Sequence, residues 1–175
     1  GGSAVQQSKT CEIASLIRSN YHIEPVSHLT CVNARKDKII ETLNTLKENS
    51  VQNILALRGD LPAGEENRSD FAHASDLAAF IKSYDASFNL VGACYPECHY
   101  ESQSLEADIE NLKYKIDSGV THLITQLFFD NQRFYEFINK VRQAGITVPI
   151  QAGIMPIVNK NQIERTISMC GASIP

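Results

Sequence analysis

The stretch Asn53-Ile54-Leu55-Ala56-Leu57-Arg58-Gly59-Asp60-Leu61-Pro62 is an apolar run that stops abruptly at an arginine, a glycine and an aspartate. A buried parallel strand is typically a continuous hydrophobic run, and the ligand groups of α/β proteins gather where such strands end. The run therefore predicts a strand over 53–58. It also predicts that Arg58 and Asp60 lie where a ligand would bind.

The composition describes an ordinary globular chain. Its 175 residues, 43% of them hydrophobic and 21% charged, suffice for one core and are too few for several domains, so we expect a single domain over 1–175. Sixteen basic and twenty acidic residues give a net charge of -4 without a clustered basic stripe, which argues against a nucleic-acid partner. No apolar run approaches the roughly 20 residues that span a bilayer, and no signal-peptide pattern opens the chain. We therefore expect no membrane partner and a cytoplasmic location.

The cysteines give no framework for disulfides or metal. They are odd in number and include no Cys-x-x-Cys pair, which disfavours a disulfide scaffold. Cys94, Cys98 and His99 lie close in sequence, but a fourth ligand at finger-like spacing is missing. We expect buried or loop thiols and no metal site. The five cysteines are Cys11, Cys31, Cys94, Cys98 and Cys170.

Two kinds of segment alternate along the chain. Short apolar or β-branched runs predict strands at 27–32, 53–58, 90–95, 122–128 and 149–155. Amphipathic stretches predict helices at about 4–19, 36–48, 72–84, 104–118, 131–143 and 159–169. Such alternation requires parallel strands with right-handed crossovers and helices packed outside. The predicted class is α/β, with about five parallel strands and flanking helices.

The polar residues at the strand ends favour a piece of a barrel over an open sheet. They recur after each of the first four strands, whereas an open doubly wound sheet concentrates its ligand groups at one switch point. No GxGxxG or GxxxxGK loop stands in any strand-to-helix turn, so a glycine-rich phosphate cradle is not indicated. These strand-end residues are Thr30, Asn33, Arg58, Asp60, Glu97, His99, Gln126 and Asp130.

The helix boundaries carry the expected capping residues. Gly119 and Gly145 follow two predicted helices and suit left-handed C-caps. Ser104 precedes an acidic first turn, which complements the positive end of a helix. Residues 62–72 form a polar loop with turn residues and are the expected mobile element.

Seven blocks of sequence belong together. They are His28-Leu29-Thr30-Cys31, Leu57-Arg58-Gly59-Asp60, Ala74-Ser75-Asp76-Leu77, Tyr95-Pro96-Glu97-Cys98-His99, Glu106-Ala107-Asp108, Ile124-Thr125-Gln126-Leu127-Phe128-Phe129-Asp130 and Gly153-Ile154-Met155-Pro156. In this order they resemble the methylenetetrahydrofolate reductase family. A lone Arg-Gly-Asp would mean little, whereas seven ordered blocks make the resemblance specific.

The resemblance implies an eight-stranded (β/α) TIM barrel in the parent family, with FAD across the C-terminal ends of the strands. It implies two half-reactions: NADH or NADPH reduces FAD, and the flavin then delivers hydride to 5,10-methylenetetrahydrofolate, giving 5-methyltetrahydrofolate. The flavin carries the hydride, and the protein supplies position and electrostatics. The implied partner is the folate substrate, and a homo-oligomer or a partner subunit is compatible with the resemblance. The sequence does not distinguish NADH from NADPH.

The resemblance also implies site residues. Asp60 matches an aspartate near both the flavin ring and the folate, where a carboxylate would stabilise a cationic folate iminium, so it is the implied catalytic group. The alternative from the residues alone is a turn or helix-capping aspartate for Asp60, and surface salt bridging for Arg58 and Lys115. The implied cofactor-binding residues are His28, Arg58, Gly59, Asp60, Ala74, Tyr95, His99, Asp108, Asn111 and Lys115. His73 matches a position that varies among relatives.

Spacing adds one expectation: Asp108, Asn111 and Lys115 should project from one helical face. On the substrate side, Gln126 matches a glutamine that binds the pterin end of folate, and Gln162 matches a second folate-binding position. Thr166 departs from the family, because some relatives carry an aromatic residue there. We expect Phe128 and Phe129 to pack into the barrel wall.

Parts of the family pattern have no counterpart in these 175 residues. They are the first strand, with its Phe-Glu-Phe-Phe-Pro-Pro signature and general-acid glutamate, the second strand, and the last barrel unit. The resemblance therefore implies a barrel truncated at both ends. The alternative to reductase activity is a catalytically silent fragment that is structural or only binds flavin. An unrelated (β/α) enzyme that shares the Arg-Gly-Asp turn by chance is a third alternative, which the ordered blocks disfavour.

Overall fold

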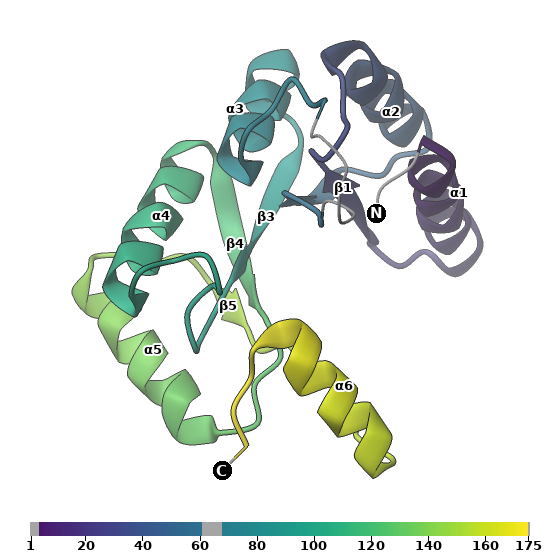
Figure 1. The fold of residues 1–175 in the computed structure, drawn as a ribbon. Coiled ribbons are helices and arrows are strands. Elements are labelled where there is room, and N and C mark those ends of the chain that lie inside the picture. Colours follow the sequence, from purple (N-terminus) through teal and green to yellow (C-terminus); the bar gives the residue numbers. More distant parts are fainter. Residues whose placement is uncertain (1–3, 61–67, 175) are drawn as a thin grey trace. The chain divides into compact units, whose positions relative to one another are not determined.

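The computed structural model describes residues 4–60 and 68–174, in which helices and strands alternate along the chain (Figure 1). The elements are α1 (Ala4–Tyr21), β1 (Val26–Thr30), α2 (Lys36–Glu48), β2 (Asn53–Leu57), α3 (Ala74–Tyr84), β3 (Asn89–Cys94), α4 (Leu105–Asp117), β4 (Val120–Thr125), α5 (Asn131–Gln143), β5 (Ile150–Gln151) and α6 (Lys160–Cys170). The predicted order of one helix followed by five strand–helix units is confirmed.

All five strands end before the last residue of the predicted apolar run, and the difference is largest for β4 and β5. The run at 122–128 continues past the end of β4 because the ring of Phe128 leaves the sheet and stacks on Phe134 of α5, with centroids 4.8 Å apart. The run at 149–155 yields only Ile150–Gln151 as strand, because the apolar residues that follow lie in a loop. The apolar residues that follow β4 and β5 thus belong to loops, where some pack on a helix and others are exposed.

The five strands form one sheet in the order β1-β2-β3-β4-β5. The pairs β1–β2, β2–β3 and β4–β5 are parallel, with registers that place Leu29 beside Ala56 and Ala56 beside Gly92. A doubly wound open sheet reverses its strand order at a switch point, whereas a (β/α) barrel adds each strand beside the previous one. The sequential order confirms the predicted α/β class and is that of a barrel segment.

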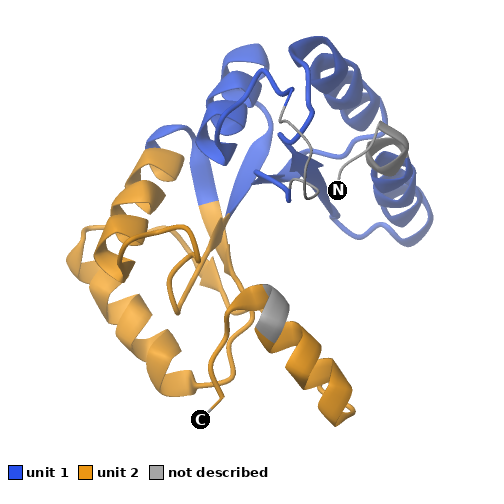
Figure 2. Cartoon of the chain, in the orientation of Figure 1, with its two compact units in different colours: residues 1–92, 117–121 blue, residues 93–116, 122–175 orange. Residues whose placement is uncertain are grey.

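The chain divides into two compact units (Figure 2). Unit 1 comprises residues 1–92 and 117–121, and unit 2 comprises 93–116 and 122–175. In unit 1, β1 alternates buried Ser27 and Leu29 with exposed Val26 and His28, so its two faces differ sharply. The buried side chains of this unit's helices and strands include Ile39, Leu43, Leu46, Ile54, Leu77, Ile81 and Leu90, all with no exposed surface.

Unit 2 has its own core between α4, β4 and α5. Leu123, Phe137 and Val141 have no exposed surface there. Lys140 of α5 pairs with Glu106 of α4 at 2.6 Å. The guanidinium of Arg142 donates to the carbonyls of Ile146 and Val148, at 2.7 and 3.0 Å, and so fixes the turn into β5.

The helix ends follow the predicted chemistry. Gly119 and Gly145 have φ of 101° and 83°, the left-handed region that favours glycine. Gly171 caps α6 in the same way, with φ 68°, although the sequence interpretation did not single it out. Ser104 Oγ accepts the Ala107 N–H at 3.1 Å at the start of α4.

The predicted polar loop 62–72 is only partly within the described residues, since 61–67 lie outside them. The part from Arg68 is anchored to the segment after β1. The Arg68 N–H donates to Asn33 Oδ1 at 3.2 Å, and the Asp70 N–H donates to the Ala34 carbonyl at 3.0 Å. Phe71 is buried. Residues 68–72 therefore belong to the packed body of unit 1.

Within residues 4–60 and 68–174, no helix combines the length and the hydropathy needed to cross a bilayer. The five cysteines are free thiols. In the same described part of the chain, no three His, Cys, Asp or Glu side chains lie together in a group that could hold a metal ion.

Candidate functional site

All predicted site residues lie among the described residues, and they form one set in each unit. The set in unit 1 lies within β1, directly after β2 and at the start of α3; it comprises His28, Arg58, Gly59, Asp60 and Ala74. The set in unit 2 lies after β3, after β4, within α4 and within α6; it comprises Tyr95, His99, Asp108, Asn111, Lys115, Gln126 and Gln162.

In unit 1 the ladder between β1 and β2 continues past both strands into the Arg-Gly-Asp turn. The Cys31 N–H donates to the Leu57 carbonyl at 3.0 Å, and the Val32 N–H to the Arg58 carbonyl at 2.9 Å. Gly59 has φ 82°, and a Cβ added there would lie 3.1 Å from Thr30 Cβ. Glycine is therefore required at position 59 for two reasons, backbone conformation and close approach.

The side chains around this turn differ in exposure. Arg58 is half-buried, Asp60 is exposed, and His28 is exposed on the face of β1 opposite to Ser27 and Leu29. Cys31 Sγ donates to the Arg58 carbonyl at 3.3 Å. Burial raises the pKa of the Cys31 thiol to about 11, so Cys31 holds the backbone and is not a thiolate at neutral pH.

Ala74 is the first residue of α3, and its position is fixed by the residues around it. The His73 N–H donates to Asp76 Oδ2 at 2.8 Å, which is the backbone half of a capping box. His73 itself is exposed.

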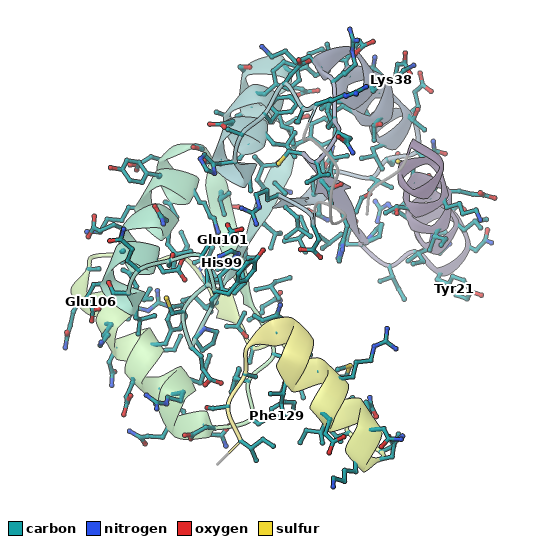
Figure 3. The ribbon with its side chains drawn as sticks, viewed as in Figure 1. Tyr21, Lys38, His99, Glu101, Glu106 and Phe129 are labelled. Carbon is teal, nitrogen blue, oxygen red and sulfur yellow. The ribbon has the colours of Figure 1, made fainter. Side chains whose placement is uncertain are left out.

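In unit 2 a buried carboxylate organises the loop after β3. Asp108, 5% exposed in α4, accepts the His99 N–H at 3.1 Å and the Ser102 hydroxyl at 3.3 Å. The ring of His99 packs edge-on against Tyr95, with centroids 4.6 Å apart. The Glu101 N–H donates to His99 Nδ1 at 3.2 Å, and Figure 3 shows His99 and Glu101 together in this loop. The loop therefore presents Tyr95 and His99 in fixed orientations.

Lys115 belongs to α4, and its side chain reaches the end of β3 instead of forming a surface ion pair. Its Nζ donates to the Ala93 carbonyl at 2.8 Å and lies 5.7 Å from the centre of the Tyr95 ring. Burial lowers the pKa of Lys115, and the nearby Asp108 carboxylate opposes that shift. Asn111 is exposed, so of the three residues expected on one face, the structure turns Asp108 and Lys115 inward and leaves Asn111 in solvent.

Gln126 follows β4 and is held on both sides. Its N–H donates to the Cys94 carbonyl at 2.7 Å, and its side-chain Oε1 accepts the Leu127 N–H at 2.8 Å. The neighbouring Thr125 hydroxyl accepts the Gly153 N–H at 2.9 Å. A Cβ on Gly153 would lie 2.3 Å from the Thr125 carbonyl oxygen, so only glycine fits there.

Gln162 bonds to the chain through both the oxygen and the nitrogen of its amide. Its Oε1 accepts the Val158 N–H at 3.0 Å, and its Nε2 donates to the Pro156 carbonyl at 3.2 Å. The buried Thr166 donates its hydroxyl to the Gln162 carbonyl at 2.9 Å, so it is a helix residue in the core of α6.

Some polar strand-end residues have structural partners that sequence reasoning missed. Both carboxylate oxygens of Glu97 accept the Ser173 N–H, at 3.1 and 3.0 Å, and the Ser173 hydroxyl donates to the same carboxylate. Asp130 accepts the Gln132 N–H at 2.8 Å and caps α5. The Asp130 cap has a local signal, an aspartate just before a helix, whereas the Glu97 contact spans 76 residues and leaves none.

Similar solved structures show the same fold at low sequence identity. A 2,3-dimethylmalate lyase of the PEP mutase/isocitrate lyase superfamily matches with a TM-score of 0.59 and 8% identity, over 91% of this chain and 56% of that chain. A dihydrodipicolinate synthase matches with a TM-score of 0.52 and 16% identity, over 85% of this chain and 52% of that chain. These folds are TIM-barrel-like, and at such identities the likeness concerns the fold alone.

The sequence comparisons are more specific. The family model described as methylenetetrahydrofolate reductase matches residues 1–175. A probable methylenetetrahydrofolate reductase (NADH) of Oryza sativa subsp. japonica is 41% identical over 189 residues, which cover 100% of this chain and 32% of that protein. The 5,10-methylenetetrahydrofolate reductase of Escherichia coli (strain K12) is 36% identical over 175 residues, covering 100% of this chain and 58% of that protein. The chain thus spans about a third to just over half of these relatives. Since the family model covers every residue and two named reductases agree with the chain at more than a third of positions, the chain belongs to the methylenetetrahydrofolate reductase family.

Proposed function

We propose that the protein carrying this chain reduces 5,10-methylenetetrahydrofolate to 5-methyltetrahydrofolate, with FAD as hydride carrier and NADH or NADPH as donor, and that residues 1–175 are part of its catalytic barrel domain. The observation that carries the proposal is that all 175 residues match the family and relatives named as this reductase. The polar groups gathered after the parallel strands support it.

The donor set of each unit suits a flavin dinucleotide. Such a cofactor combines an anionic pyrophosphate, a polar side chain and a flat ring, and when bound it supplies hydride transfer. In unit 1, the half-buried Arg58 offers a guanidinium fork for phosphate or ring oxygens, and Gly59 lets backbone approach closely. In unit 2, Lys115 offers an ammonium, and Tyr95 and His99 offer ring faces and edges. The remaining residues proposed to hold FAD are His28, Asp60, Ala74, Asp108 and Asn111.

Asp60 is the proposed catalytic residue. Its carboxylate is exposed, and Asp60 directly follows Gly59, whose φ of 82° turns the backbone at the end of β2. A carboxylate beside the substrate would stabilise the cationic iminium form of methylenetetrahydrofolate by Coulombic attraction. Its contribution is electrostatic, since the hydride itself comes from the cofactor.

Gln126 is proposed to bind the pterin ring. Because Oε1 accepts the Leu127 N–H, the plane of the Gln126 amide is fixed. The amide nitrogen then points in one direction and can donate to a heterocycle acceptor. Gln162 is the second proposed folate-side residue.

The test is a pair of half-reactions on the full-length protein loaded with FAD. Oxidation of NADH or NADPH with menadione reports reduction of the flavin, and methylenetetrahydrofolate-dependent reoxidation reports the folate step. Asp60→Asn should slow the folate step by roughly 100-fold or more while flavin reduction changes much less. Equal loss in both steps would show that Asp60 only supports the fold, and a wild-type protein inactive in both would refute the proposed reaction.

A further inference from the structure

The turn that follows β1, residues 31–34, has an uncommon backbone conformation. The Ala34 N–H donates to the Cys31 carbonyl at 3.1 Å, which closes a four-residue turn. Its third residue, Asn33, has φ 54°, in the left-handed region that glycine, asparagine and aspartate adopt more readily than other residues. The backbone therefore explains why position 33 is one of these three residues. It does not explain the side chain, which is exposed.

One side of this turn holds the Arg-Gly-Asp segment. The Val32 N–H donates to the Arg58 carbonyl at 2.9 Å, and Cys31 Sγ donates to the same carbonyl at 3.3 Å. A Cβ on Gly59 would lie 3.4 Å from Val32 Cγ2, so the two segments are in close contact. Asp60 is the next residue after this contact. The position of the turn therefore influences where Asp60 lies.

The other side of the turn holds the chain on its way to α3. The Arg68 N–H donates to Asn33 Oδ1 at 3.2 Å. The Ala34 carbonyl accepts the Asp70 N–H at 3.0 Å and the Ser69 hydroxyl at 3.1 Å. The chain between β2 and α3 is thus bound to one turn on both of its described sides, and the Asn33 side chain supplies an acceptor for the second contact.

The Asp70 carboxylate extends this second contact to α2. Its Oδ2 accepts the N–H of Lys36, the first residue of α2, at 2.9 Å. The first N–H groups of a helix have no partner within the helix, so Asp70 caps α2 from another segment. Two hydrogen bonds of opposite direction, from Arg68 to Asn33 and from Lys36 to Asp70, therefore join the loop after β2 to the segment after β1.

We propose that Asn33 is a positioning residue for Asp60: its side chain holds the loop between β2 and α3 on the turn after β1, and so limits where the Asp60 carboxylate lies. The inference rests on the proposed function, because it takes Asp60 as the group that stabilises the folate iminium. Coulombic stabilisation falls with distance, so a carboxylate whose position varies stabilises the cation less. A loop that is already ordered also avoids the entropy loss that substrate binding would otherwise impose.

The contact between Asn33 and Arg68 is tested by limited trypsin digestion of the full-length protein, followed as the appearance of a new N-terminus at Ser69. Cleavage after Arg68 requires local opening, so its rate follows the population of the opened loop. Asn33→Gly keeps the positive φ and removes the acceptor, so cleavage should quicken by about 2- to 10-fold, the equivalent of one net hydrogen bond.

Two further variants make this digestion specific. Asn33→Asp keeps an acceptor oxygen and tolerates the left-handed conformation, so cleavage after Arg68 should stay near the wild-type rate. Ser50→Gly is the matched control, because Ser50 is an exposed residue of unit 1 with φ 58°. It makes the same kind of backbone change away from the loop and should leave the cleavage unchanged.

The kinetic arm measures the two half-reactions on the full-length protein loaded with FAD. Asn33→Gly should slow the folate step by about 3- to 30-fold, with a much smaller effect on flavin reduction, and Asn33→Asp should recover most of the rate. In the Asp60→Asn background, where the charge is absent, Asn33→Gly should slow the folate step by less than about 2-fold. Ser50→Gly should leave the folate step unchanged in both backgrounds.

The proposal is overturned if Asn33→Gly changes neither the cleavage after Arg68 nor the folate step, or changes one without the other. Equal slowing of the folate step with and without the Asp60 charge would also overturn it, because Asn33 would then support the fold and not the carboxylate. A wild-type protein without folate reductase activity refutes the proposed function instead, while cleavage after Arg68 still decides whether the contact exists.

Discussion

Asp108 of α4 accepts a hydrogen bond from the backbone of His99, nine residues earlier in the chain, at 3.1 Å. The same carboxylate accepts the Ser102 hydroxyl, and it lies close enough to Lys115 to oppose the lowering of that ammonium's pKa. One buried side chain thus joins the loop after β3 to the helix that follows it. Asp108, which we expect to contact the cofactor, therefore also holds in place the loop that carries His99.

The first prediction concerns this carboxylate. Asp108→Ala should lower the free energy of unfolding by about 1–3 kcal/mol, because the His99 N–H and the Ser102 hydroxyl lose their acceptor. Urea denaturation of the chain measures the change. Glu110→Ala, at an exposed position of the same helix, is the control and should cost less than about 0.5 kcal/mol. Equal effects of the two variants would show that Asp108 is a surface charge in solution.

The second prediction separates two reasons for glycine at the Arg-Gly-Asp turn. Gly59 and Gly145 have nearly equal φ, 82° and 83°, but a Cβ at Gly59 would meet Thr30 at 3.1 Å, whereas nothing lies within 4 Å at Gly145. Gly145→Ala should therefore cost about 1 kcal/mol of unfolding free energy from backbone strain alone. Gly59→Ala should cost about 1 kcal/mol more, from the contact. Thermal or urea unfolding of both variants gives the difference, and a Gly59 variant no worse than the Gly145 variant would refute the close approach.

The third prediction concerns alkaline pH. Burial raises the pKa of Cys31 to about 11 from an ordinary value of 9.0, so the folded state holds its thiol proton more tightly than the unfolded state. The buried, protonated Cys31 thiol therefore makes its full contribution to the free energy of unfolding below pH 9, and this contribution is lost as the pH rises toward 11. Between pH 8 and 10, wild type should lose about 1 kcal/mol more than Cys31→Ala. Urea denaturation at each pH measures the free energy of unfolding of the two proteins. An equal decrease for wild type and Cys31→Ala would show that the thiol is not buried in solution.

Whether a structural feature could be predicted from the sequence depends on how far apart in the chain the interacting residues lie. The strands and helices follow from periodicity, and the caps at Gly119, Gly145 and Ser104 follow from local chemistry. The end of β5 could not be predicted, because the apolar residues Ile154 and Met155 read as strand but lie exposed in a loop.

The candidate site shows the same limit. The positions of Arg58 and Asp60 after a strand follow from the pattern, since a parallel strand must end at the ligand edge. Two contacts could not be predicted: the hydrogen bonds of the Gln162 amide to Val158 and Pro156, and the contact of Glu97 with Ser173. They depend on where a turn brings backbone groups, which residue identity does not encode. Such contacts decide whether a polar residue near a strand end faces a ligand or a neighbouring loop.

The last prediction concerns Glu97, which lies between Tyr95 and His99 in the loop after β3. Its carboxylate accepts both the N–H and the hydroxyl of Ser173. Glu97→Gln should cost about 1–3 kcal/mol of unfolding free energy, because it removes the charge from two hydrogen bonds and turns an amide NH₂ toward a donor.

Ser173→Ala removes only the hydroxyl bond and should cost about 0.5–1.5 kcal/mol. The double variant should cost less than the sum of the two, since both changes remove the same interaction. Glu101→Gln makes the same chemical change at an exposed position of the same loop, so it is the control and should cost less than Glu97→Gln. Strict additivity in urea denaturation would show that Glu97 and Ser173 do not meet. If Glu97 does anchor this loop and the loop carries flavin contacts, Glu97→Gln should also retain less FAD after gel filtration than Glu101→Gln does.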